Sequence, residues 1–150
     1  MRALINNYDA LRDQFREKID TYGRTLLFDF ERYRDMANLT ELRAYILQLK
    51  IDRVPYADII NELQLKFGIK YNENHLCTIL SREIPERIAE AARKYHLLLD
   101  TPREKTKLCK YCGRYLPVDP LFFVRNRSRK DGFSGTCKEC EKKKRIERGG

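Results

Sequence analysis

Four cysteines in the last third of the chain are spaced as metal ligands. They form two Cys-x-x-Cys pairs, Cys109-Lys-Tyr-Cys112 and Cys137-Lys-Glu-Cys140, with 24 residues between the pairs. Two thiolates at this spacing can hold one ion from a tight turn, and two such turns supply the four ligands of a closed tetrahedral zinc site. The spacing therefore predicts a structural Zn²⁺ site, and the segment between the pairs is long enough for a β-hairpin.

The positive charge of the chain is confined to the same region. The 150 residues include 31 Lys+Arg and 22 Asp+Glu, a net charge of +9, and residues 101–150 hold 15 and 6 of these. Residues 1–100 therefore hold 16 of each sign and are neutral. Charge concentrated in this way predicts a surface that faces a polyanion, most simply nucleic acid. A basic tail that only keeps the chain in solution is the alternative.

Composition excludes several other classes of protein. Hydrophobic residues make up 42% and charged residues 35% of the chain, and no run of about eighteen apolar residues is present, so no membrane span is expected. The first residues lack the long apolar run of a secretory signal. Cysteines in metal-ligand spacing indicate a reducing compartment rather than a disulfide framework, so we expect a cytoplasmic location.

Residues 1–38 are predicted to form an N-terminal helical segment. Large apolar side chains recur at intervals of three and four over residues 3–22, which predicts a helix with one apolar face that ends at Gly23. This face either packs into the core or forms a seam for self-association. The side chains that form it are Leu4, Tyr8, Leu11, Phe15, Ile19 and Tyr22.

Residues 39–100 predict a second helical domain. Thr40 is the expected N-cap of a helix that runs to about Lys50, and Pro55 stands at the start of the next, which ends at Gly68. A further helix opens at Asn72, and Pro85 is expected to begin the last one. Two helices joined by a short glycine-containing turn describe a helix-turn-helix unit. Its exposed candidates for reading base edges are Asn74, Thr78 and Arg82, unless this is only a solvated face.

Residues 101–107 read as a polar linker, and residues 108–150 as a basic zinc-binding module with four cysteine ligands. A short strand is expected over residues 121–124, a turn at Asp131-Gly132, and a helix that opens at the second cysteine pair. The expected fold class is thus a mainly α N-terminal domain (helix-turn-helix) plus a small α+β zinc ribbon of treble-clef-like order. The module's basic side chains form two candidate phosphate-contacting clusters, Arg125, Arg127, Arg129 and Lys130, then Lys138, Lys142, Lys143, Lys144 and Arg145.

Two resemblances follow from these motifs. The segment of about 40–84, with Ala57 as a small residue early in one helix and the turn Gly68-Ile-Lys-Tyr-Asn72, resembles the helix-turn-helix domains of phage regulators and transposases. The tail resembles the zinc-binding segment of phage proteins and of His-Asn-His endonucleases, in both cysteine pairs, Leu116-Pro117, Phe122 or Phe123, and Asp131-Gly132. These resemblances imply a phage or mobile-element protein in a bacterial host cell. Those endonucleases use histidines to bind a catalytic metal, and no histidine follows Cys140.

The functional hypothesis is therefore a zinc-containing protein that binds nucleic acid, most simply double-stranded DNA, and that is not an enzyme. An adaptor that joins proteins in a phage nucleoprotein, packaging or transcription assembly is the alternative, and a metal-dependent nuclease is a third. The remaining cysteine, Cys77, is expected to be a buried side chain rather than a fifth ligand. His75 and His96 are expected to lie on helix surfaces.

Overall fold

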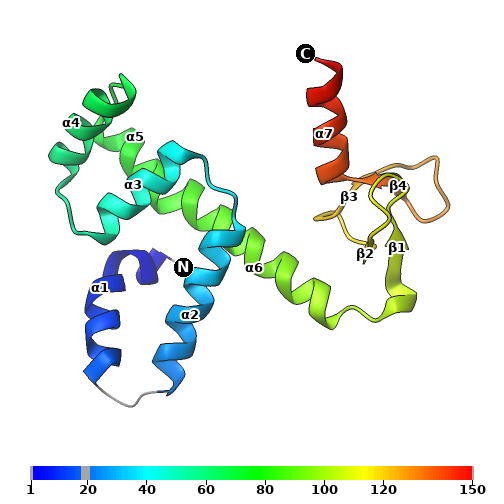
Figure 1. Ribbon diagram of the computed structural model, residues 1–150, viewed down its shortest axis with the longest axis horizontal. Helices are drawn as coiled ribbons and strands as arrows, with labels where there is room; N and C mark the ends of the chain where they lie inside the picture. The colour runs from blue at the N-terminus through cyan, green and yellow to red at the C-terminus, as the bar shows by residue number, and fades with distance from the viewer. Residues whose placement is uncertain (1, 18–20, 150) are drawn as a thin grey trace. The chain divides into compact units, whose positions relative to one another are not determined.

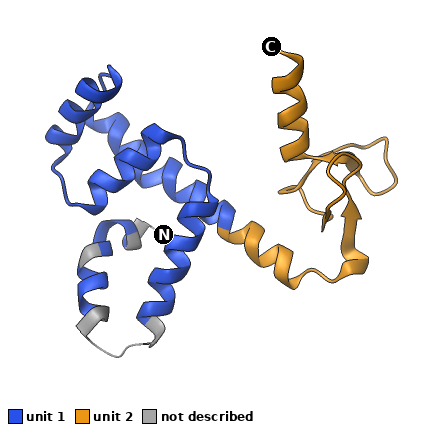
Figure 2. Ribbon diagram, in the orientation of Figure 1, with its two compact units in different colours: residues 1–91 blue, residues 92–150 orange. Residues whose placement is uncertain are grey.

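The computed structural model describes residues 2–17 and 21–149, drawn in Figure 1. They fall into two compact units, residues 1–91 and residues 92–150 (Figure 2). The first is helical and the second is a small α+β module, which confirms the predicted fold class. The division lies inside a helix, at Ala91 and Ala92. Among the helices of the described residues, none combines the length and the apolar character that a membrane crossing needs.

The first unit contains the helices α1 (Arg2–Glu17), α2 (Thr21–Met36), α3 (Glu41–Ile51), α4 (Tyr56–Phe67) and α5 (Glu73–Thr78). A π-helical turn, η1 (Ile79–Glu83), leads into α6 (Ile84–Asp100), whose last nine residues belong to the second unit. The second unit continues with the 3₁₀ turn η2 (Arg103–Lys105), β1 (Thr106–Leu108), β2 (Tyr115–Pro117), β3 (Phe123–Arg125), β4 (Phe133–Cys137) and α7 (Lys138–Arg148). The residues expected as a linker, 101–107, thus include η2 and the start of β1.

The N-terminal segment differs from its prediction. Instead of one helix over residues 3–22 that ends at Gly23, α1 ends at Glu17 and Gly23 lies buried inside α2. Helix α1 packs against α2 and α3, and the ring centre of Tyr8 lies 5.6 Å from that of Phe30. Of the predicted stripe, Tyr8 is buried and Leu11 half-buried. The side chains of Leu4, Phe15, Ile19 and Tyr22 lie outside the described residues.

The ends of α3, α4 and α5 marked by Thr40, Gly68 and Asn72 follow the sequence signals. The Thr40 hydroxyl accepts a hydrogen bond from the backbone N–H of Arg43 (3.4 Å), and the Asn72 side chain accepts one from that of His75 (2.7 Å). Gly68 ends α4 in the left-handed conformation, with φ of 66°. Leu76, Ile79 and Leu80 are buried along one side of α5 and η1. Ala57, by contrast, is exposed and does not mark a close helix crossing.

Gly68 gives a direct test of this turn. We expect Gly68→Ala to destabilise the helical unit by about 1 kcal/mol, because a Cβ disfavours positive φ. A Cβ built at this position meets nothing within 4 Å, so the cost comes from the backbone alone. Hydrogen exchange of α4 and α5 amides in the zinc-loaded full chain should show protection reduced about fivefold. Gly68→Asn is the matched control and should cost less, since Asn tolerates this conformation; equal protection in wild type and Gly68→Ala would contradict the expectation.

Pro85 does not begin a new helix, which corrects the prediction. Helical residues run without a break from Glu73 to Asp100, and Pro85 lies inside this run. Proline cannot donate the hydrogen bond that its position requires, and its ring crowds the carbonyl four residues earlier. The chain widens into η1 at this place, where the N–H of Ile84 bonds the carbonyl of Ile79, five residues back. The ion pair of Arg43 with Glu83 ties η1 to α3.

Candidate metal centre and basic surface

The four cysteines of the two pairs come together in the second unit. Their sulfur atoms all lie within 4.8 Å of one another. Cys109, Cys137 and Cys140 are buried, and Cys112 is exposed. Among the described residues, no other group of three or more His, Cys, Asp or Glu side chains is arranged to hold a metal ion.

The first pair is held by a tight turn between β1 and β2, which are antiparallel with Leu108 opposite Tyr115. The N–H of Cys109 donates to the carbonyl of Arg114 (2.9 Å), and the N–H of Gly113 donates to the carbonyl of Cys109 (2.9 Å). Gly113 has φ of 68°, a conformation that favours glycine. This turn leaves backbone N–H groups, those of Tyr111 and Cys112 among them, aimed at the sulfur of Cys109.

The second pair lies at the start of α7, as the sequence predicted. Cys137 is the N-cap residue and Cys140 lies in the first turn, where unpaired N–H groups and the positive end of the helix dipole favour thiolates. The N–H of Cys137 donates to the sulfur of Cys109 (3.3 Å), which links the two pairs directly. The N–H of Lys110 donates to the carbonyl of Gly135 (3.0 Å), which fixes the first turn against β4.

The four thiols fall into two kinds, two with a lowered pKa and two with a raised pKa. Burial would raise the pKa of Cys109, but the N–H groups of Cys112, Cys137 and Tyr111 outweigh it and lower that pKa to about 6. The guanidinium of Arg114, whose Nε lies 3.4 Å from the sulfur, lowers the pKa of Cys112. Burial is the main cause that raises the pKa of Cys137, and it raises that of Cys140 to about 12.

These residues fit a structural zinc ion. Tetrahedral zinc with Zn–S bonds of about 2.3 Å needs sulfurs about 3.8 Å apart, and the four sulfurs already lie within 4.8 Å of one another. A divalent ion bound to these sulfurs would also offset the cost of burying thiolates, which is the main cause of the raised pKa of Cys137 and Cys140. Cys109, Cys112, Cys137 and Cys140 therefore form a zinc-binding site, which confirms the predicted cofactor.

Zinc binding should release protons. In the folded module Cys109 has a pKa of about 6, whereas burial raises the pKa of Cys137 and Cys140, which hold protons that the metal must displace at pH 7. In a metal-free module that is unfolded, all four thiols have their ordinary pKa and hold protons. We therefore expect at least about two protons, and up to about four, to be released per ion at pH 7, and zinc affinity to fall as the pH is lowered. Calorimetric titration of the metal-free chain in buffers of different ionisation enthalpy measures this number. Release of fewer than one proton would contradict the assigned protonation states.

A small apolar cluster surrounds the sulfurs. Leu116, Phe122 and Phe123 are buried with the ligand cysteines, and Leu97, Leu121 and Phe133 pack against them. All but Leu97 lie between the two cysteine pairs in the sequence. Leu97 comes from the last turns of α6, which explains why this end of the helix belongs to the second unit.

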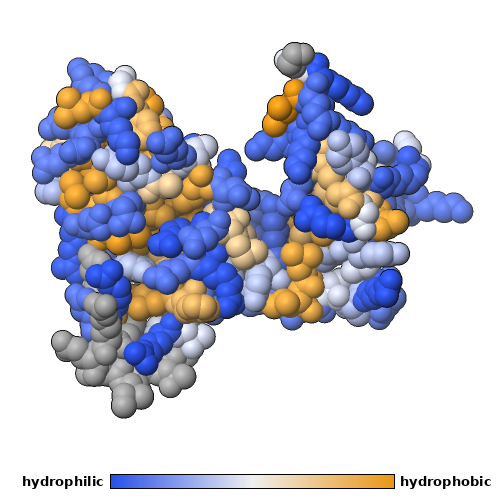
Figure 3. All heavy atoms as spheres, in the orientation of Figure 1, coloured by the Kyte–Doolittle hydropathy of each residue, from blue (hydrophilic) through white to orange (hydrophobic). Residues whose placement is uncertain are grey.

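The nine basic side chains of the two predicted phosphate-contacting clusters all lie in this module, and most are exposed. Lys144 alone is half-buried, with its Nζ 4.7 Å from the centre of the Tyr111 ring. Within the described part of the chain, none of the nine forms an ion pair with an acidic side chain. Figure 3 shows hydrophilic residues over most of α7. The nine are Arg125, Arg127, Arg129, Lys130, Lys138, Lys142, Lys143, Lys144 and Arg145.

The geometry of the first basic cluster differs from its prediction. The strand expected over residues 121–124 is shifted, since β3 covers Phe123–Arg125. Arg125 is the last residue of β3, and Arg127 and Arg129 lie in the turn that follows it. Backbone bonds close this turn, from Asn126 N–H to the carbonyl of Gly132 (2.7 Å) and from Gly132 N–H to that of Arg129 (3.0 Å). Gly132 has φ of 73°, as a turn at Asp131-Gly132 requires.

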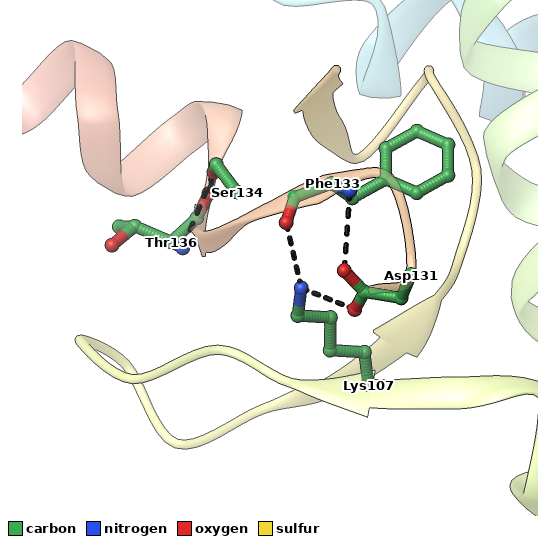
Figure 4. A network of polar contacts seen from close by, with 5 residues as sticks. All are labelled: Lys107, Asp131, Phe133, Ser134 and Thr136. Atoms are coloured by element: carbon green, nitrogen blue, oxygen red, sulfur yellow. Dashed lines mark hydrogen bonds and ion pairs between the residues drawn. The ribbon is translucent and has the colours of Figure 1, made fainter. Parts of the chain in front are cut away.

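Two ion pairs in the module were missed from the sequence. Lys107 pairs with Asp131 and also donates to the carbonyl of Phe133 (3.0 Å), as Figure 4 shows. The second carboxylate oxygen of Asp131 accepts from the N–H of Phe133 (3.2 Å), so this residue ties the turn to β1. The pair lowers the pKa of Asp131. Arg114 bridges Cys112 and Glu139, and its place two residues after a ligand was the available signal.

The candidates for base reading lie in the helical unit. Asn74 in α5 and Arg82 in η1 are exposed, as predicted. Thr78 is half-buried instead, and its hydroxyl donates to the carbonyl of Asn74 (2.9 Å). The Thr78 donor is thus used inside the helix, whereas the side chains of Asn74 and Arg82 face solvent.

Cys77 and the two histidines stand apart from the metal site. Cys77 is exposed, which corrects the prediction of a buried side chain, because the buried side of this helix passes through Leu76, Ile79 and Leu80. His75 is exposed and its ring stacks on Tyr71, with centres 4.6 Å apart. His96 is exposed on α6, edge-on to Tyr95.

Comparison of the chain with models of known protein families, with curated proteins and with solved structures found no match. The chemistry must therefore be inferred from the side chains themselves, namely the four sulfurs and the cations around them.

Proposed function

We propose that this chain is a zinc-containing nucleic-acid-binding protein whose main ligand is double-stranded DNA. One observation carries the proposal: nine cations lie on one small zinc module, and none is neutralised by an acidic partner among the described residues. Phosphate neutralisation supplies most of the affinity of proteins for DNA. Zinc has the structural role of fixing the turn and the helix that carry these cations.

The helical unit would contribute recognition rather than affinity. Residues 1–100 are neutral in total, so they offer little attraction to phosphates. The arrangement of α4, the turn at Gly68 and α5 supports a helix-turn-helix role, in which Asn74 and Arg82 reach base edges. The likeness of both halves to phage and mobile-element proteins supports an origin of that kind.

Two other functions have less support. Self-association through α1 would need its apolar face to be free, but Tyr8 packs against Phe30 of the same chain. A nuclease would need groups that bind a catalytic metal and activate water, and His75 and His96 both lie upstream of the cysteine module. We therefore expect no cleavage of supercoiled DNA in magnesium or manganese.

The salt dependence of binding tests the proposal. The zinc-loaded chain should bind a mixed-sequence duplex with an affinity that falls steeply between about 50 and 200 mM salt. Five or six neutralised phosphates give a slope of about −5 in a plot of log K against log salt. Fluorescence anisotropy of a labelled duplex at four salt concentrations measures the slope, with a single strand of the same length for comparison. Absent or salt-independent binding would rule the proposal out.

A further inference from the structure

A basic hollow opens between the first cysteine pair and the turn that follows β3. It encloses about 460 Å³ and is lined by Lys107, Lys110, Ser128, Arg129, Lys130 and Asp131, with Gly135 beside them. Lys110 lies between two metal ligands, Cys109 and Cys112, while Arg129 and Lys130 come from the turn. The hollow thus brings together side chains that are about twenty residues apart in the sequence.

The charged side chains of the hollow differ in whether an ion pair already occupies them. Asp131 is the acidic group of the lining, and it is paired with Lys107, which also holds the carbonyl of Phe133 (Figure 4). This pair adds no net charge to the lining. Lys110, Arg129 and Lys130 are exposed, and no acidic partner is present for them among the described residues. Three cations therefore remain available to one anion.

The backbone around the hollow holds these side chains in place. Lys110 N–H donates to the carbonyl of Gly135, and the Lys110 stem lies across that glycine, where an added Cβ would meet its Cδ at 3.3 Å. The Asn126 side chain accepts from the N–H of Ser128 (3.0 Å), so the turn has its own fixed form. The Ser128 hydroxyl adds a neutral donor, a group that suits a phosphate oxygen.

We propose that this hollow binds a phosphate group of the nucleic-acid backbone through Lys110, Arg129 and Lys130. The inference rests on the proposed function and names the place where the module holds one phosphodiester most closely. A backbone phosphate fits better than a free one, because the cations are exposed side chains around an open hollow and a polymer is also held by α7. Zinc controls the position of Lys110, since both residues that flank its turn are metal ligands.

The experiment compares two double variants of the zinc-loaded full chain. Lys110→Gln with Arg129→Gln removes two cations of the hollow, and Lys142→Gln with Arg145→Gln removes two exposed cations of α7 as a matched control. We expect the hollow variant to bind duplex DNA at least about tenfold more weakly than the control. Each variant removes two cations, so the salt slope of each should be flatter than that of wild type by about two; the additional loss of affinity in the hollow variant then comes from the convergence of its side chains on one phosphate.

A third variant adds a change in the opposite direction. Asp131→Asn keeps an oxygen for the N–H of Phe133 but leaves the charge of Lys107 unpaired, so binding should become a few times tighter. Zinc content and amide spectra establish that each variant is folded.

The inference is overturned, with the proposed function intact, if the hollow variant binds as well as the control. It is overturned equally if folded Asp131→Asn binds no more tightly than wild type. Absence of salt-dependent binding by wild type would remove the proposed function as well. Inorganic phosphate that displaces the duplex at low millimolar concentration would show a free-anion site instead.

Discussion

Removal of zinc is expected to unfold residues 107–147 and to leave the helical unit folded. Among the described residues of the module, the buried apolar side chains besides the cysteines are Leu116, Pro117, Phe122 and Phe123. Its strands have three to five residues each, in two separate two-stranded sheets. Such a small core is insufficient by itself, and a structural zinc ion supplies on the order of 10 kcal/mol. The amides of α3, α4 and α5 do not depend on the metal, because their core is Ile46, Leu47, Ile59, Leu63 and Leu76.

Hydrogen exchange before and after treatment with a strong chelator measures this effect residue by residue. Cys109→Ser should reproduce the loss without a chelator, since it removes a ligand whose sulfur also accepts the N–H of Cys137. Cys77→Ser is the matched control, because Cys77 is exposed and outside the metal site. Protection of β2, β4 and α7 that survives metal removal would show that the module folds without the ion.

Charge reversal in the module is expected to have the second large effect. The triple variant Arg125→Glu, Arg127→Glu and Lys143→Glu should weaken binding to every duplex by about a hundredfold or more, on the order expected when about three phosphate contacts are lost. The loss should be the same for different sequences, because phosphates carry no sequence information. Affinities for a panel of duplexes at fixed salt provide the measurement.

The control for this variant changes the net charge by the same amount elsewhere. Arg12, Arg24 and Arg87 are exposed and belong to the helical unit, and their reversal to Glu should have a much smaller effect. Asn74→Ala or Arg82→Ala should instead alter the preference among sequences by about 1–3 kcal/mol for the affected base pair. Equal losses in the two triple variants would indicate that net charge, and not the module's surface, governs binding.

Local signals explain which parts of the fold could be predicted. Thr40 and Asn72 cap helices, and Gly68 and Gly132 take positive φ, because each effect depends on one residue and its neighbours in sequence. The metal site was predictable for the same reason. Each cysteine pair forms its own turn, and the ion's need for four ligands brings the two turns together.

The predictions that were wrong concern places where contacts between residues far apart in the sequence determine the local structure. Gly23 reads as a helix end, yet α2 includes it. Pro85 reads as a helix start, yet a π-helical turn absorbs the missing hydrogen bond and the helix continues. Cys77 is exposed because it lies on the side of its helix that faces away from the core. None of these outcomes is encoded in a short window of sequence.

The basic hollow shows the same limit at the functional site. Arg129 and Lys130 were identified as phosphate-contacting residues, but Lys107 and Lys110 were not, because they precede the turn by about twenty residues. The Lys107–Asp131 pair is visible only once β1 and β4 are placed in one module. Arg129 lies in the turn after β3 and lines this hollow, a position that the predicted strand over residues 121–124 did not indicate.

Metal analysis of the freshly purified chain tests the central claim most directly. Elemental analysis should find about one zinc ion per chain, and sulfur coordination should be visible in the X-ray absorption spectrum of that ion. Cys77→Ser should retain the ion, and Cys140→Ser should lose it. A chain that is folded in residues 107–147 but contains no bound metal would contradict the account.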